Sequence, residues 1–313
     1  MELTETLRRA VNRECSCGGS GPDDPLCCPA CRIWHAVTGT LRISPEGRDP
    51  SLAWLRLGIF SDWVLPTDED LRFVAEKLRM DDLILGFNVK EYSGKGWKPK
   101  YPVRRVKERI RACRDAGLKP IVMTWAIRSE KAIVEMCEWI QSVIDSNTEI
   151  LLDAEADWHR GNGINAVDAA YLVTNKLRDR RVGVTGLGQL QDTVRPLASR
   201  ASFCVPQAYS FWSPIGGHWS QSPSTFPGPQ QDQAFKTWSS AGPAQIIMAL
   251  GCYWGNRPAS KMTPKLQVSQ TMRFAAIETA SLGVSTVWYW SLKWARAKTA
   301  AGREVREFFG VKE

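Results

Sequence analysis

Three acidic residues follow one short apolar run near the middle of the chain. The run Ile150–Leu152 leads into Asp153, Glu155 and Asp157, with one alanine between each pair. Because side chains alternate along a strand, the three carboxylates are predicted to share one face, although Asp157 can instead cap a following helix. Carboxylates crowded together raise the pKa of at least one of them, which can then donate a proton near neutral pH. Cleavage of a glycosidic bond requires such a pair of carboxyl groups.

The cysteines form a second group of chemically capable residues. The chain has nine, and five lie in the first 31 residues. Two short-spaced pairs, Cys15 with Cys17 and Cys28 with Cys31, predict a closed structural zinc site, with Cys27 and His35 as reserve ligands. Disulfides or free thiols are the alternatives. A closed zinc site has no catalytic role, and no cofactor is expected for catalysis. Four other cysteines lie singly in apolar patterns and are expected to be small buried side chains: Cys113, Cys137, Cys204 and Cys252.

The elements that must position the carboxylates form a regular alternation. Eight apolar or aromatic runs predict strands at 55–63, 82–89, 119–126, 149–158, 181–187, 202–212, 244–254 and 285–292. Amphipathic patterns predict helices at 68–80, 104–117, 129–145, 166–179 and 267–283, a weaker one at 188–200, and a short one near 231–238. The alternation predicts an α/β fold, a (β/α)8 TIM-like barrel over residues 51–313, preceded by a Cys-rich zinc-binding-like module and linker at 1–50. An open doubly wound sheet is the alternative, but the first strand lacks the Gly-rich turn that such sheets use to bind phosphate.

In such a barrel the active site lies at the carboxyl ends of the strands. Polar and aromatic residues occur at nearly every predicted strand end. The substrate-binding candidates there are Asn88, Trp125, Asp157, Gln207, Tyr209, Trp254 and Trp290, and Asp62 is a further catalytic candidate beside Asp153 and Glu155. Aromatic side chains at these positions suit stacking on sugar rings, although each tryptophan alone could be packing in the core or rim.

The segment ILLDAEADWHRG (150–161) resembles the fourth-strand D-x-E signature of glycoside hydrolase family 25, the lysozymes of phages and bacteria. LGIFSDW is similar to that family's first-strand motif, with Phe60 where the family has an acid and Asp62 two residues further on. VPQAYSFW is similar to its Tyr-bearing sixth strand. The resemblance implies Glu155 as general acid, Asp153 orienting the N-acetyl group or stabilising the developing cation, Asp62 assisting, and Tyr209 hydrogen-bonding near the reacting sugar. The implied reaction is hydrolysis of the muramic acid to glucosamine linkage of peptidoglycan.

Charge and composition restrict the partners. The 313 residues carry a formal net charge of +8, which favours an anionic partner and does not choose between nucleic acid, a membrane surface and the bacterial cell wall. No run is long and apolar enough for a membrane span, and the N-terminus lacks the apolar core of a secretory signal. A lysozyme of this kind is expected to be cytoplasmic until released to the wall, as a phage endolysin, or carried on the virion. The alternatives are a glycosidase acting on another polysaccharide, a non-catalytic carbohydrate-binding or structural barrel and, least favoured, a zinc-knuckle nucleic-acid binder.

Overall fold

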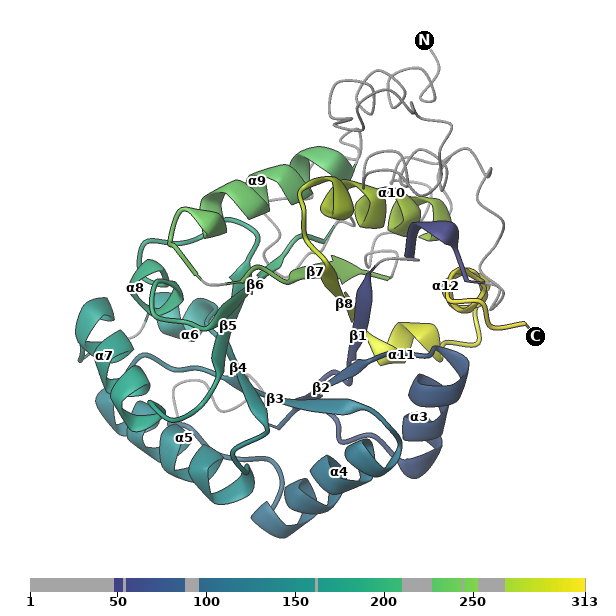
Figure 1. The fold of residues 1–313 in the computed structure, drawn as a ribbon. Coiled ribbons are helices and arrows are strands. Elements are labelled where there is room, and N and C mark those ends of the chain that lie inside the picture. Colours follow the sequence, from purple (N-terminus) through teal and green to yellow (C-terminus); the bar gives the residue numbers. More distant parts are fainter. Residues whose placement is uncertain are drawn as a thin grey trace.

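Eight parallel strands close into a barrel in this computed structural model, which describes residues 48–52, 55–87, 96–160, 163–209, 227–243, 245–252 and 268–312 (Figure 1). The strands are β1 (Arg56–Phe60), β2 (Asp82–Gly86), β3 (Lys119–Trp125), β4 (Glu149–Asp153), β5 (Val182–Leu187), β6 (Phe203–Gln207), β7 (Met248–Gly251) and β8 (Thr286–Trp290). Each strand pairs with the next in the sequence, and β8 pairs with β1. The predicted barrel is confirmed, and the open doubly wound sheet is wrong.

The helices form a ring outside the strands (Figure 1). The longer ones are α3 (Asp68–Arg72, continued by the π-helical η2, Phe73–Lys77), α4 (Val103–Asp115), α5 (Glu130–Val143), α7 (Ala166–Lys176), α9 (Pro227–Ser239), α10 (Val268–Ser281) and α12 (Ala300–Phe308). The short ones are η1 (Pro50–Leu52), α6 (Ala156–His159), α8 (Arg195–Ala198) and α11 (Leu292–Ala295). Ser129 caps α5 by accepting from the backbone N–H of Ala132.

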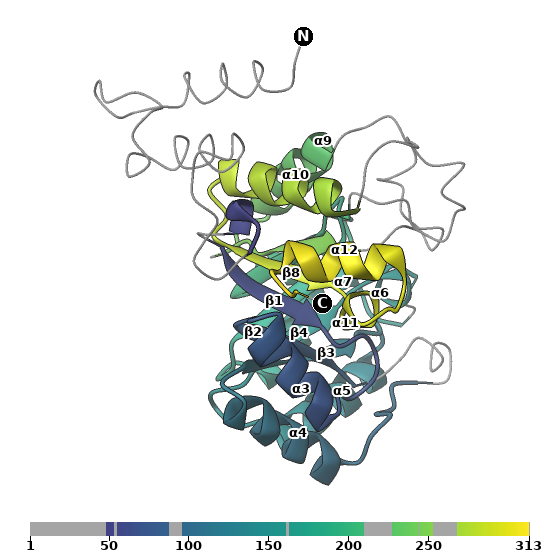
Figure 2. The ribbon, with the colours of Figure 1, turned by 90° about the vertical axis from the view of Figure 1, so that its right-hand side faces the viewer.

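Two expectations about helices were wrong in detail. The helix predicted at 188–200 shrinks to the four residues of α8, because the chain there runs as turns through Thr193. The C-terminal helix α12 was not predicted, although it packs against α10 and α11 on the outside of the barrel (Figure 2). Its buried residues, Gly302, Val305 and Phe308, lie on one side of a strongly amphipathic helix, so the sequence pattern could have indicated it.

Alternation along the strands divides the core in two. One cluster fills the barrel's interior and contains Phe60, Ile84, Ile121, Met123, Leu151, Phe203, Val205, Ile247, Ala249 and Trp288. The other lies between the strands and the helices, and it includes Cys113, Cys137, Cys204 and Cys252, which are buried and free as expected. A side chain at Gly183 would point into the interior, because its Cβ would lie 2.1 Å from a ring carbon of Phe203. Residues that share parity with the interior cluster therefore face the barrel's axis.

Ion pairs close the end of the barrel where the strands begin. Arg56 donates to both carboxylate oxygens of Asp82, and Trp288 Nε1 donates to the same carboxylate at 3.0 Å. Glu149 pairs with Lys119 at 2.5 Å and with Arg181 at 3.3 Å. These groups are paired with one another and lie far from the strands' carboxyl ends. Any chemistry of the barrel is thereby left to its opposite end.

The Cys-rich segment, with Cys15, Cys17, Cys28 and Cys31, lies outside the described residues, as do Asn88 and Trp254. In the part of the chain that the structure describes, no helix is long and apolar enough to cross a bilayer.

Candidate active site at the carboxyl ends of the strands

Asp153 is the last residue of β4 and faces the interior of the barrel. It shares parity with Leu151 of the interior cluster, and it lies beside Trp125 of β3 and Thr185 of β5 in the sheet. Only 3% of it is exposed, and its Oδ1 atom has no hydrogen-bond partner among the described residues. Burial raises the pKa of this carboxyl well above its usual range, and the charge of Glu155 raises it further. Asp153 is therefore a carboxyl group that favours its neutral, protonated form.

Glu155 reaches the barrel's mouth from a turn and not from a strand. The strand expected to continue to residue 158 ends at Asp153, and Glu155 is the N-cap of α6. The backbone N–H groups of Trp158 and His159 donate to the Glu155 carbonyl at 2.9 and 3.0 Å, which closes the first turn of that helix. The Glu155 carboxylate accepts a hydrogen bond of 2.8 Å from Gln207 Nε2 at the end of β6. Gln207 shares parity with Phe203 and Val205, so this bond draws Glu155 over the interior of the barrel.

Asp157 lies in the first turn of α6, so the alternative of a following helix is the one that holds for it, and the three acids do not alternate on one strand. The Asp157 side chain contacts β3, where Trp125 Nε1 donates to Asp157 Oδ2 at 2.6 Å. Trp125 itself is only 5% exposed. Asp157 thus orients an indole ring in the wall of the site.

Asp62 follows the end of β1, and Figure 1 shows β1 on the opposite side of the barrel from β4. Its backbone is left-handed, with φ 61°, a conformation that Asp tolerates better than most residues. Ser291 Oγ, just after β8, donates to Asp62 Oδ2 at 2.8 Å. Burial raises the pKa of Asp62, and the Ser291 hydrogen bond and the charge of Lys293 oppose that rise. Ser291 was not among the predicted site residues, although its place directly after a strand could have marked it.

Aromatic rings pack together at the same end of the barrel as these carboxyl groups. Trp63 packs edge-on against Trp125 and Trp290, with ring centroids 6.1 and 6.5 Å apart. Phe60 packs against Trp290 at 5.1 Å. Trp63, Trp290 and Tyr209 are half-buried and lie against the interior cluster. The arrangement joins a wall of rings to acids from both sides of the barrel, which suits a sugar ring held near a proton donor.

Neither a protein-family model nor a curated protein sequence matches this chain. Among solved structures, a GH113 β-1,4-mannanase is similar, with a TM-score of 0.56 at 12% identity, covering 82% of this chain and 98% of that one. Active domain 2 of a thermostable chitinase from Pyrococcus furiosus has a TM-score of 0.52 at 14% identity, covering 82% and 94%. The spore cortex-lytic enzyme SleL of Bacillus cereus has a TM-score of 0.50 at 11% identity, covering 82% and 75%. At these identities the likeness is one of fold: a (β/α)8 barrel of the kind that glycoside hydrolases have.

Proposed function

We propose that this protein is a glycoside hydrolase that cleaves a cell-wall polysaccharide, with peptidoglycan as its substrate. The observation that carries the proposal is the pair formed by Asp153 and Glu155. One member is buried with an unpartnered oxygen, and the other is held over the barrel's mouth by Gln207. A carboxyl pair at the carboxyl ends of barrel strands supports acid-catalysed cleavage of a glycosidic bond.

The different environments of the two carboxyl groups favour a different role for each. Glu155 is half-buried, whereas Asp153 is fully buried, so Glu155 is the proposed general acid that protonates the leaving oxygen. Asp153 is buried and has a raised pKa, so we propose that it holds the proton of the pair at rest and passes it to Glu155. Once Glu155 has passed this proton to the leaving oxygen, both carboxyl groups are ionised, and their charge faces the cation that develops on the sugar. Asp153 then orients the substrate's N-acetyl group or stabilises the developing cation.

The remaining residues are proposed to hold the sugar. Asp62 assists from the opposite side of the barrel, fixed by Ser291. Tyr209 hydrogen-bonds near the reacting sugar, and Trp290 supplies an aromatic wall together with Trp125. Gln207 keeps Glu155 in place, a role closer to positioning than to the direct substrate binding expected from the sequence.

Peptidoglycan is favoured over other polysaccharides by the D-x-E resemblance to family 25 lysozymes and by the net charge of +8. A solved structure of similar fold is a spore cortex-lytic enzyme. The test is to incubate purified peptidoglycan with the full chain and to identify the new reducing-end sugar. N-acetylmuramic acid is expected, and Glu155→Gln is expected to lower the rate about 10²–10⁴-fold, since it removes the proton donor. Clearing by that variant at the parental rate would contradict the assignment.

A second candidate is a carbohydrate-binding barrel without turnover, which Phe60 favours. Family 25 has an acid at this position, whereas here the side chain is 1% exposed and packed among rings. Tight glycan binding with no new reducing ends would support it. A hydrolase with a different polysaccharide substrate would instead release products from another member of a glycan panel.

The N-terminal module is proposed to bind structural zinc through Cys15, Cys17, Cys28 and Cys31 and to serve in docking to the wall. Release to the wall as a phage endolysin, or carriage on the virion, belongs to the same proposal. Metal analysis of the purified chain against a variant with all four cysteines changed to serine tests the zinc site.

A further inference from the structure

Four basic residues form one stripe along α4. Arg104, Lys107, Arg111 and Arg114 follow one another at spacings of three, four and three residues, which places them on the same face of the helix. The ends of the stripe are neutralised: Arg104 pairs with Glu108 at 2.9 Å, and Arg114 pairs with Asp145 through two bonds of 2.6 and 2.8 Å. The middle of the stripe holds the other two cations.

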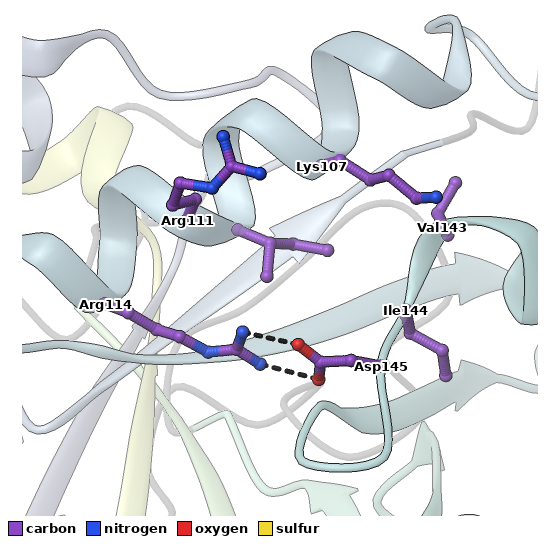
Figure 3. A pocket seen from close by; sticks show the side chains of 7 residues that line it. Lys107, Arg111, Arg114, Val143, Ile144 and Asp145 are labelled. Atoms are coloured by element: carbon purple, nitrogen blue, oxygen red, sulfur yellow. Dashed lines mark hydrogen bonds and ion pairs between the residues drawn. The ribbon is translucent and has the colours of Figure 1, made fainter.

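A hollow of about 280 Å³ lies beside this stripe, between α4 and the segment that follows α5 (Figure 3). Its lining consists of Lys107, Ile110, Arg111, Arg114, Val143, Ile144 and Asp145. Figure 3 shows the three basic side chains extending from one helix, with Arg114 bridged to Asp145 on the far wall. Lys107 and Arg111 are exposed and have no ion pair within the described ranges. The hollow therefore carries two uncompensated positive charges.

The chemistry of the lining narrows the kind of partner. Lysine and arginine bind carboxylates and phosphates, and the arginine fork can do so with two bonds. The lining has no aromatic ring on which a nucleic-acid base could stack, and two free cations are few for a phosphate backbone. Ile110, Val143 and Ile144 add apolar surface for the uncharged part of a chain. These features favour a non-aromatic polymer with carboxylate groups.

The hollow is remote from the candidate active site. Helices of a barrel run back from the strands' carboxyl ends, and Val143–Asp145 lie just before β4 begins at Glu149. Asp153 lies at the other end of that strand. A polymer bound in this hollow is therefore not the segment being cleaved.

We propose that this hollow is a second polysaccharide-binding site, which takes a carboxylate-bearing stretch of the wall polymer and holds the enzyme on insoluble material. The identity of the polymer rests on the proposed function, but the site is tested by binding alone. Lys107 and Arg111 make the ionic contacts, and Arg114 with Asp145 forms a rigid wall.

The experiment measures retention of the full chain on purified peptidoglycan sacculi at low ionic strength, in the Glu155→Gln background so that turnover does not alter the material. Lys107→Ser combined with Arg111→Ser is expected to weaken binding about tenfold, since each exposed ionic contact contributes up to about 1 kcal/mol. Sacculi whose carboxylates have been amidated should bind the parent as weakly as the variant. The difference between parent and variant should shrink in high salt.

A matched control removes the same charge elsewhere. Lys298→Ser with Arg303→Ser changes two basic residues of another hollow, near the start of α12, and should leave retention unchanged. Equal losses in both double variants would mean that net charge alone drives binding, and would overturn the site. Unchanged retention of the Lys107/Arg111 variant, or a loss of DNA binding without a loss of sacculus binding, would overturn it as well. Retention that needs Lys107 and Arg111, together with no cleavage by the protein that keeps Glu155, would refute the proposed hydrolysis and leave the binding site standing.

Discussion

Replacing Asp153 with asparagine is expected to stabilise the protein at neutral pH while lowering its activity. The folded state raises the pKa of Asp153 by burial and by the charge of Glu155, so between the unfolded and folded pKa values the folded chain binds more protons than the unfolded one. The parent's stability from this group is therefore fully present below the unfolded pKa of about 3.9 and is lost as the pH rises toward the folded pKa. Asparagine has the same shape and does not titrate.

The magnitude follows from linkage. The stability advantage of Asp153→Asn over the parent should grow by up to about 1.4 kcal/mol for each pH unit above about 4, and then level off above the folded pKa. Each kcal/mol corresponds to about 2 °C in Tm for a chain of this size. The assay is urea unfolding followed by tryptophan fluorescence at a series of pH values from acidic to mildly alkaline.

The control is a variant whose stability relative to the parent should change with pH in the opposite direction. Arg114 holds the pKa of Asp145 well below its usual range, so that carboxylate contributes stability above its unfolded pKa and loses it in acid. Asp145→Asn should therefore be slightly destabilising at neutral pH and close to neutral in acid, with a small effect because half of the side chain is exposed. Parallel pH curves for the parent and Asp153→Asn would refute the reasoning, because they would mean that Asp153 ionises as freely in the fold as in the unfolded chain.

Two further predictions follow from single contacts. Gln207→Leu removes the amide that donates to Glu155 and should lower kcat about 10–100-fold with little change in Tm; its pH–rate profile should shift relative to the parent's, whereas a purely structural role for Gln207 would leave the profile in place. Gly183→Ala places a Cβ 2.1 Å from the Phe203 ring and should destabilise the barrel by about 1–3 kcal/mol in urea unfolding. Phe203→Leu should recover part of that loss in the double variant, and strictly additive losses would show that the two side chains do not compete for the same space.

The strands were predictable because their interior and exterior faces are both apolar. Each is a short run between amphipathic helices, and all eight are present with shorter ends than predicted. The placement of Asp153 follows from the same pattern, since it continues the parity of Leu151. Local alternation therefore identifies a buried acid wherever the strand itself persists.

The placement of Glu155 was harder to predict, because it depends on Gln207, a residue 52 places away. Its carboxylate meets Gln207, and its backbone begins α6, so neither fact is encoded in the alternation around it. Asp157 shows the same limit, since its carboxylate accepts from Trp125, a residue 32 places away. Hydrogen bonds between strand ends that are distant in the sequence decide the geometry of the mouth, and periodicity carries no information about them.

At the end of the first strand, packing decides which type of residue fits each position. Phe60 fills the interior at the end of β1, packing against Trp288 at 6.1 Å and Trp290 at 5.1 Å, so an acid at that position would be buried among rings without a partner. Asp62 lies two residues later, where a left-handed backbone turns its carboxylate to Ser291 and within the field of Lys293. The chain thus has an apolar floor on this side of the barrel and a carboxyl group at the rim above it. A sugar bound there would meet rings below and an acid above, so Asp62 would contact the periphery of the substrate, and the pair at the end of β4 would remain the proposed proton donor.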